Sequence, residues 1–209
     1  MKIVIFGASG RTGYQVVEQA LEAGHYVTAF VRTPSKIGIQ NKNLSLFQGD
    51  VLDASQVEKA ITGQDAVIST LGPTRPPVKG MMETAARNIT QAMQKHGVRR
   101  LVSTTGAGVR DPQDQPKLMD KLIKGLLTLL SREVLEDSEA NVKVIRSTDL
   151  DWTIVRFPML KDGAHTGEYR AGFVGKNSGS QISRCDGADF VVKELSEGEF
   201  IHKAPIVSY

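Results

Sequence analysis

The sequence has a single cysteine, Cys185, among its 209 residues. One thiol excludes a disulfide scaffold and any metal site built from cysteines alone. Long apolar runs are also missing, because none approaches the roughly 18 residues that a membrane-spanning helix needs. The first residues run straight into a strand-like segment and contain no signal-peptide cleavage site. We therefore expect a cytoplasmic protein with no membrane partner.

The sequence also lacks a strong charge of either sign. It has 26 Lys and Arg against 23 Asp and Glu, a formal net charge of +3, and its longest basic cluster is Arg99-Arg100. Nucleic-acid binding needs a basic stripe, so we expect no nucleic-acid partner. The four histidines show no metal-ligand spacing, so we expect no metal site. The length and the 40% hydrophobic content fit one globular domain spanning residues 1–209.

Short apolar runs alternate with segments of helical spacing along most of the chain. Strands connected in this way by helices lie parallel, with right-handed crossovers, so the fold class is α/β: a doubly wound parallel sheet of Rossmann type. The pattern predicts strands at residues 2–6, 26–31, 44–47, 66–70, 100–104 and 152–156. It predicts helices at residues 12–23, 54–61, 79–95, 116–130, a stretch ending near Arg146, and 186–195.

Two parts of the chain have less definite interpretations. Residues 157–185 are irregular and rich in glycine, and we predict a substrate loop there because ligands bind outside the carboxyl ends of the strands. The predicted helix at 116–130 has a broad apolar stripe, which favours a core-facing or pocket-covering helix over a dimer face. We therefore expect a monomer or a weak homodimer.

The strongest motif is the glycine-rich turn Gly7-Ala8-Ser9-Gly10-Arg11-Thr12-Gly13, which directly follows the first strand and opens the first helix. Gly7 allows a sharp turn, Gly10 lets the main chain approach a pyrophosphate, and Gly13 lets the helix pack closely on the sheet. The free amides and the positive end of the helix then face the phosphates. This context predicts a dinucleotide site.

The end of the second strand indicates which dinucleotide is bound. NAD-specific sites usually place a carboxylate there, about 20 residues after the glycines, to hold the ribose hydroxyls. Arg32 stands at that point instead, with Arg11 in the glycine turn and Ser35 and Lys36 close behind. Arginine presents paired donors to a phosphate, so we expect NADP(H); the alternative for Arg32 is a solvated surface charge.

Other candidate cofactor contacts follow the later strands. Asp50 and Val51 end the third strand, where Asp50 either accepts a hydrogen bond from the adenine amino group or shapes a turn. The remaining contacts are expected on the ribose and nicotinamide side: Leu71, Gly72, Thr104, Thr105, Phe157, Pro158 and Met159.

Taken in order, these residues resemble the atypical short-chain dehydrogenase/reductases, which include NmrA-like regulators and the biliverdin-IXβ reductase or flavin reductase branch. The resemblance implies a Rossmann sheet, an NADPH site and a shallow substrate pocket over the nicotinamide. The segments that carry it are residues 7–13, 31–32, 49–52, 63–68, 86–89, 96–98 and 150–156.

Two positions depart from the flavin reductase branch. Gly106 stands where that branch has a serine after the fifth strand, and Met159 stands where it has a histidine after the proline. Thr105 keeps a hydroxyl at a position where other members have one. The resemblance therefore implies cofactor binding rather than tetrapyrrole reduction.

The sequence offers few groups for acid–base catalysis. The standard short-chain dehydrogenase places a lysine four residues after a tyrosine, so that the ammonium lowers the pKa of the phenol. Tyr14, Tyr26 and Tyr169 are followed at that distance by Glu, Phe and Phe, and Tyr209 by nothing. The candidates that remain are Thr105 and, as a proton donor in the predicted substrate loop, His165.

A reaction that needs only hydride transfer suits such a site. Flavins and quinones accept a hydride and take protons from water, so the protein mainly supplies orientation. We expect an NADPH-dependent reductase of a small aromatic or conjugated acceptor. The alternatives are a non-catalytic, NmrA-like sensor of NADP(H) and, disfavoured by the missing tyrosine–lysine pair, an epimerase or isomerase.

Overall fold

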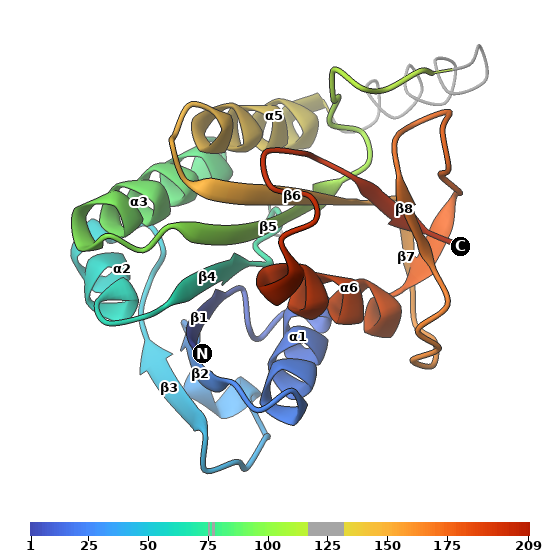
Figure 1. Ribbon diagram of the computed structural model, residues 1–209. Coiled ribbons are helices and arrows are strands. Elements are labelled where there is room, and N and C mark those ends of the chain that lie inside the picture. The colour runs from blue at the N-terminus through green and yellow to red at the C-terminus, as the bar shows by residue number, and fades with distance from the viewer. Residues whose placement is uncertain (75, 77, 117–131) are drawn as a thin grey trace.

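The computed structural model describes residues 1–209 except 75, 77 and 117–131. Its main sheet has eight strands in the order β3-β2-β1-β4-β5-β6-β10-β8 (Figure 1). The strands are β1 Lys2–Phe6, β2 Tyr26–Val31, β3 Leu44–Gln48, β4 Ala66–Ser69, β5 Arg100–Gly106, β6 Asp151–Phe157, β8 Arg170–Gly172 and β10 Ile206–Ser208. All pairings are parallel except that of β8 with β10, which confirms the predicted fold class and adds an antiparallel edge strand.

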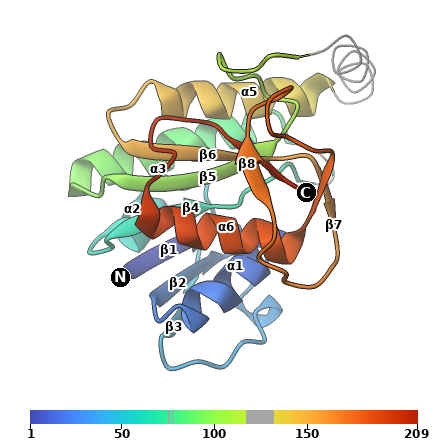
Figure 2. The ribbon, with the colours of Figure 1, turned by 45° about the vertical axis from the view of Figure 1, so that its right-hand side comes forward.

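Helices cover both faces of this sheet, as a sheet buried on both sides requires. Helices α1 (Arg11–Glu22) and α6 (Arg184–Glu197) lie side by side on one face (Figure 2). Helices α2 (Ala54–Ile61), α3 (Met81–His96) and α5 (Arg132–Arg146) cover the other. The buried side chains form two clusters, one beneath each helical layer. A short 3₁₀ helix, η1 (Pro34–Lys36), follows β2.

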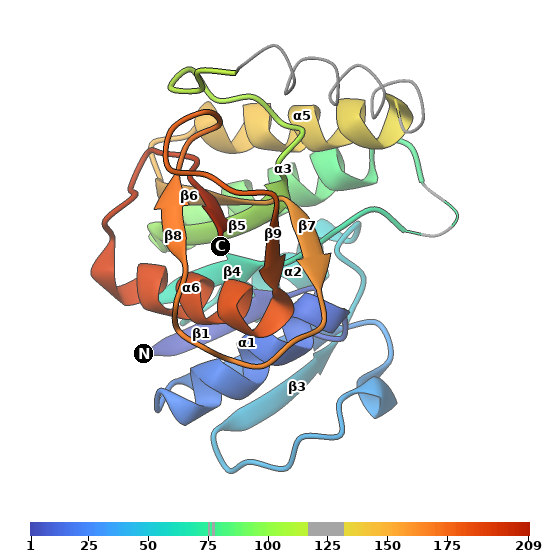
Figure 3. The ribbon, with the colours of Figure 1, turned by 90° about the vertical axis from the view of Figure 1, so that its right-hand side faces the viewer.

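The predicted substrate loop is more regular than expected. Residues 157–185 contain three short strands: β8 joins the main sheet, while β7 (Met159–Lys161) and β9 (Gln181–Ser183) form a separate parallel pair in front of it (Figure 3). Strands of three residues leave too little periodicity to be read from a sequence. The predicted helix at residues 116–130, apart from its first residue, lies outside the described residues.

The strand order indicates where a ligand would bind. The order reverses direction between β1 and β4, because the connection after β3 returns to the other side of β1. In open α/β sheets, ligands bind outside the carboxyl ends of the strands at such a switch point. The glycine-rich turn follows β1 directly and therefore lies at this position.

Candidate functional site

The glycine-rich turn has the close contacts that its sequence predicts. Gly7 has a φ of +79°, and a Cβ there would lie 2.8 Å from the Thr70 backbone. A Cβ on Gly13 would lie 2.1 Å from the Gly7 carbonyl oxygen and 2.6 Å from the Thr70 hydroxyl. Gly10 is exposed and occupies the N-cap of α1. The predicted roles of Gly7 in the turn and Gly13 in helix packing are confirmed, and Ala8 is buried beneath them.

The amino end of α1 differs from those of α2, α3 and α6, because no side chain of the described residues accepts a hydrogen bond from its first amides. Asp53 caps α2, Ser183 caps α6, and Asp137 on α5 accepts hydrogen bonds from Met82 N and Glu83 N at the start of α3. No side chain of the described residues caps α1. Among the described residues, its first N–H groups therefore have no side-chain acceptor, and they lie just beyond the carboxyl end of β1, as a pyrophosphate site requires. The residues present fit a bound dinucleotide.

A cavity of about 250 Å³, which we call the switch-point cavity, opens beside this turn. It lies at the carboxyl ends of β4, β5 and β6. Of the expected residues, it brings together Thr12, Leu71, Gly72, Thr104, Thr105, Phe157 and Pro158. Pro73 and Gly106, which continue the two expected segments, line it as well, and four further lining residues were not indicated by the sequence: Thr70, Met82, Ser138 and Leu160.

Met159 does not reach the switch-point cavity, which corrects its expected place beside the nicotinamide. Its side chain is 60% exposed, while Pro158 and Leu160 on either side line the cavity. Side chains of a strand alternate between its two faces, and β7 begins at Met159. Thr105 is half-buried at the cavity, and within the described residues its hydroxyl has no hydrogen-bond partner.

Helices α3 and α5 form one wall of the switch-point cavity, and polar contacts join them. Asp137 accepts hydrogen bonds from Met82 N at 3.0 Å and Glu83 N at 3.3 Å. One turn further along α5, the buried Asn141 donates to the Met82 carbonyl at 2.9 Å. Met82 and Ser138 line the cavity from these two helices. Sequence periodicity identified the helices, but only their packing decides which side chains reach the cavity.

The expected adenosine end lies at the ends of β2 and β3. Arg32, Ser35 and Lys36 are exposed there, and the Arg32 guanidinium is unpaired among the described residues. Asp50 forms a turn, since its Oδ1 accepts from Leu52 N at 3.0 Å. The Val51 carbonyl accepts from Asn88 of α3, which fixes this turn. None of these five expected residues lines the switch-point cavity.

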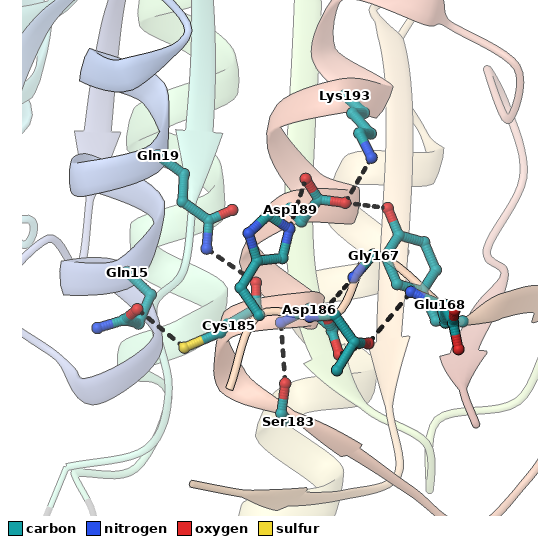
Figure 4. A network of polar contacts seen from close by, with 12 residues as sticks. Gln15, Gln19, Gly167, Glu168, Ser183, Cys185, Asp186, Asp189 and Lys193 are labelled. Atoms are coloured by element: carbon teal, nitrogen blue, oxygen red, sulfur yellow. Dashed lines mark hydrogen bonds and ion pairs between the residues drawn. The ribbon is translucent and has the colours of Figure 1, made fainter. Parts of the chain in front are cut away.

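His165 does not line the switch-point cavity. It contacts the polar network on α6 in which Figure 4 labels Asp186, Asp189 and Lys193. Its Nε2 is 3.2 Å from Asp189, whose carboxylate also binds Lys193 and the Tyr169 hydroxyl. The structure therefore does not bring His165 to the expected nicotinamide side. The loop that carries it runs along α6, because Asp186 and Asp189 of that helix hold it there.

Asp186 anchors this loop. Its side chain is fully buried and accepts hydrogen bonds from Thr166 N (2.7 Å), the Thr166 hydroxyl (2.8 Å), Gly167 N (2.9 Å) and the Tyr209 hydroxyl (2.6 Å). Burial opposes its charge, but these donors outweigh burial and lower the pKa of Asp186 to about 2. The charged carboxylate therefore stabilises the folded state.

Asp186→Asn should remove this contribution. A carboxyl group whose pKa is lowered by folding stabilises the protein above its unfolded pKa and loses that effect as the pH falls through the folded value. We expect the substitution to cost about 2 kcal/mol at pH 7. Urea unfolding measured from pH 7 to pH 2 should show wild type approaching the variant between about pH 4 and pH 2. A difference that does not change with pH would contradict this assignment.

Together, the sheet order, the glycine-rich turn and the uncapped helix define a dinucleotide-binding protein of Rossmann type. Within the described residues, no helix is long and apolar enough to cross a membrane. A cytoplasmic location stays a prediction.

Comparisons with known proteins identify the family. A family model for NAD(P)H-binding proteins matches residues 7–198, so the chain belongs to the NAD(P)H-binding family. The uncharacterized protein YwnB of Bacillus subtilis is 30% identical over 210 residues, which cover 95% of this chain and 94% of YwnB. A putative exported protein from Burkholderia pseudomallei is 27% identical, with a TM-score of 0.76 and full coverage of both chains.

Two more distant structures share the fold alone. One is a short-chain dehydrogenase/reductase from Veillonella parvula in complex with NADP, 19% identical with a TM-score of 0.81, covering 100% of this chain and 94% of that one. The other is ChuY, an anaerobillin reductase from Escherichia coli O157:H7, 22% identical with a TM-score of 0.74, covering 100% and 97%. At these identities the two structures support the Rossmann-type fold and nothing further.

Proposed function

We propose that this protein is an NADPH-dependent reductase that delivers a hydride to a flat conjugated acceptor of the flavin or quinone type. The observation that carries the proposal is the lining of the switch-point cavity. Its described residues are apolar, glycine or hydroxyl-bearing, and none of them has an acidic or basic side chain. Such a site favours an acceptor that takes its proton from water over a carbonyl that needs a protein acid.

Residues of the chain would hold and orient both reactants. The amides at the start of α1 bind the pyrophosphate, and Thr104 and Thr105 offer hydroxyls at the end of β5. Phe157, Pro158 and Leu160 form an apolar wall that excludes water and favours a flat ring. When bound, NADPH supplies a hydride, which carries two electrons and one proton. Water supplies the second proton of the acceptor, so the products are NADP⁺ and the dihydro form of the acceptor.

Two observations support NADPH over NADH. Arg32 directly follows β2, where NAD-specific proteins usually have a carboxylate, and Arg11 begins α1. Within the described residues both guanidinium groups lack an ion-pair partner, so both are free to bind a 2′-phosphate. The structural relative from Veillonella parvula was solved with NADP.

Arg32→Asp should weaken NADPH binding by about 1–3 kcal/mol, the range of a hydrogen bond to a charged group. NADH lacks the 2′-phosphate, so its affinity should stay the same or improve. Calorimetric titration of the purified protein with each coenzyme measures both effects, and Arg87→Gln serves as a control for an exposed arginine on α3. Equal losses for both coenzymes would contradict the assignment.

NADPH oxidation in the presence of FMN, riboflavin and a simple quinone tests the proposed reaction. We expect turnover with at least one acceptor, coupled to its reduction. NADP(H) binding without turnover of any acceptor would overturn the reductase and favour the alternative, a non-catalytic, NmrA-like sensor. In that case the proposed class of acceptor is wrong, but the assignment of the dinucleotide site is unaffected.

A further inference from the structure

The switch-point cavity has two halves, one on each side of the sheet. Leu101 of β5 packs in the core cluster beneath α3 and α5, and Val102 packs in the cluster beneath α1 and α6. Side chains alternate along a strand, so Thr104 faces the layer of α1 and α6, and Thr105 faces the layer of α3 and α5. Ser138 lines the cavity from α5 and therefore lies on the same side as Thr105 (Figure 1).

The coenzyme approaches the cavity from the other side. The glycine-rich turn opens α1, and Thr12 of that helix lines the cavity. Phe157, which also lines the cavity, packs in the core cluster beneath α1 and α6. None of the residues expected to hold the phosphates of the coenzyme lies on α3 or α5. The half of the cavity that faces these two helices, which we call the acceptor half, is therefore left to the second reactant.

The acceptor half presents two hydroxyl groups, and no described residue that lines it is charged. The Thr105 hydroxyl has no hydrogen-bond partner among the described residues. Ser138 Oγ donates to the Val134 carbonyl at 2.8 Å, a local bond within its own helix that a ligand can replace. A hydroxyl can both donate and accept. This pair therefore suits a group that is a carbonyl in the substrate and a hydroxyl in the product.

The wall that carries Ser138 is held in place. Asp137 and Asn141, on either side of it in α5, both form hydrogen bonds with the backbone of Met82 in α3. A hydroxyl on a rigid element keeps its place when a ligand binds. The Met82 side chain lines the cavity beside it and offers a polarizable, apolar surface to the edge of a ring.

The size of the cavity limits the acceptor. Its volume is about 250 Å³, whereas sites that enclose a whole small molecule have roughly 300–1,000 Å³. The nicotinamide ring takes part of this space. A compact acceptor of one or two rings suits the remaining space better than the three fused rings of a flavin.

We infer that Thr105 and Ser138 bind a carbonyl oxygen of a small, uncharged quinone, with Ser138 as the specificity-determining residue. This inference rests on the proposed function and narrows its acceptor class to quinones. The quinone gains a hydride from NADPH and a proton from water, so it is reduced to the hydroquinone while NADPH is oxidised to NADP⁺. The two hydroxyls stabilise the negative charge that the oxygen carries between these transfers.

Variants of Ser138 test the role of its hydroxyl. Ser138→Ala should weaken binding of 1,4-naphthoquinone about three- to tenfold, the effect of one neutral hydrogen bond, and leave binding of naphthalene unchanged. Ser138→Val should have the same effect, whereas Ser138→Thr, which has the shape of valine but keeps a hydroxyl, should bind like wild type. Ser147→Ala is the matched control, because Ser147 makes a similar local bond, to the Val144 carbonyl, just beyond α5.

Calorimetric titration in the presence of saturating NADP⁺, which cannot reduce the quinone, measures these affinities without turnover. The affinity of each variant for NADP⁺ should match that of wild type. Infrared spectra of naphthoquinone labelled with an isotope at its carbonyls give a second measurement. We expect the carbonyl stretch to lie at lower frequency in wild type than in Ser138→Ala, which a merely structural role of Ser138 would not produce.

The outcomes separate this inference from the proposed function. Equal losses for naphthoquinone and naphthalene in Ser138→Ala, a loss of NADP⁺ affinity, or an unchanged carbonyl stretch overturns the inference even if quinones are reduced. Tighter binding of riboflavin than of naphthoquinone overturns the narrowing to quinones. Binding of naphthoquinone with the expected frequency shift, but without its reduction by NADPH, supports the carbonyl site and overturns only the reductase.

Discussion

Replacing Arg156 with methionine is expected to lower the free energy of unfolding by about 3–5 kcal/mol, the cost of removing one partner from a buried ion pair. Arg156 is fully buried in β6 and binds both oxygens of Asp114, at 2.8 and 2.7 Å. It also donates to the carbonyls of Val109 and Ala204. Burial opposes the charge of Asp114, but Arg156 and backbone donors hold its pKa below the usual value. The substitution takes the balancing charge away from this carboxylate, which keeps only its backbone donors Asp111 N and Val174 N, and removes a donor from two carbonyls.

Urea unfolding followed by circular dichroism measures this loss. The double variant Arg156→Met/Asp114→Leu is the informative control, because it removes the stranded charge. We expect it to recover part of the stability but not all, since the Val109 and Ala204 carbonyls still lack a donor. A loss below about 1 kcal/mol in the single variant would be typical of an exposed pair and would contradict this account.

Gly13→Ala is expected to weaken dinucleotide binding by at least about tenfold, or about 1.4 kcal/mol. Its Cβ would lie 2.1 Å from the Gly7 carbonyl oxygen, so either α1 or the glycine-rich turn has to move. Either movement displaces the amides that hold the pyrophosphate. Overpacking of this kind also costs about 1–3 kcal/mol of stability.

The control for this effect is Gly38→Ala. A Cβ at Gly38 meets nothing nearer than the Tyr14 hydroxyl at 3.9 Å, so the substitution should change neither property. Calorimetric titration with NADPH and thermal unfolding compare the two variants. If Gly13→Ala binds NADPH as tightly as wild type, the turn does not position the coenzyme.

The sequence predicted the part of the fold whose signals are local. The run of residues 2–6 matches β1, and the helix predicted at residues 54–61 matches α2. The glycine-rich turn, read from its place between a strand and a helix, has the contacts expected of it. These features depend on neighbours along the chain, so their pattern suffices.

The parts that were missed depend on contacts between distant segments. Arg184 and Asp162 meet across the irregular stretch of residues 157–185, and nothing in that stretch marks them as partners. Ser138 and Met82 reach the switch-point cavity only because α5 packs against α3. Met159 was expected at the switch-point cavity but does not line it, because the three-residue strand β7 is too short for the alternation of its side chains to be read from the sequence.

The hydrogen bonds that join α3 to α5 limit which wall of the switch-point cavity can change to accept new substrates. Asp137 and Asn141 tie the two helices together at Met82, so that wall resists being pushed apart. The opposite wall is a three-residue strand, β7, followed by an irregular segment. Natural variation and directed evolution toward bulkier acceptors should therefore accumulate changes around Pro158 and Leu160, while the helical wall keeps its residues.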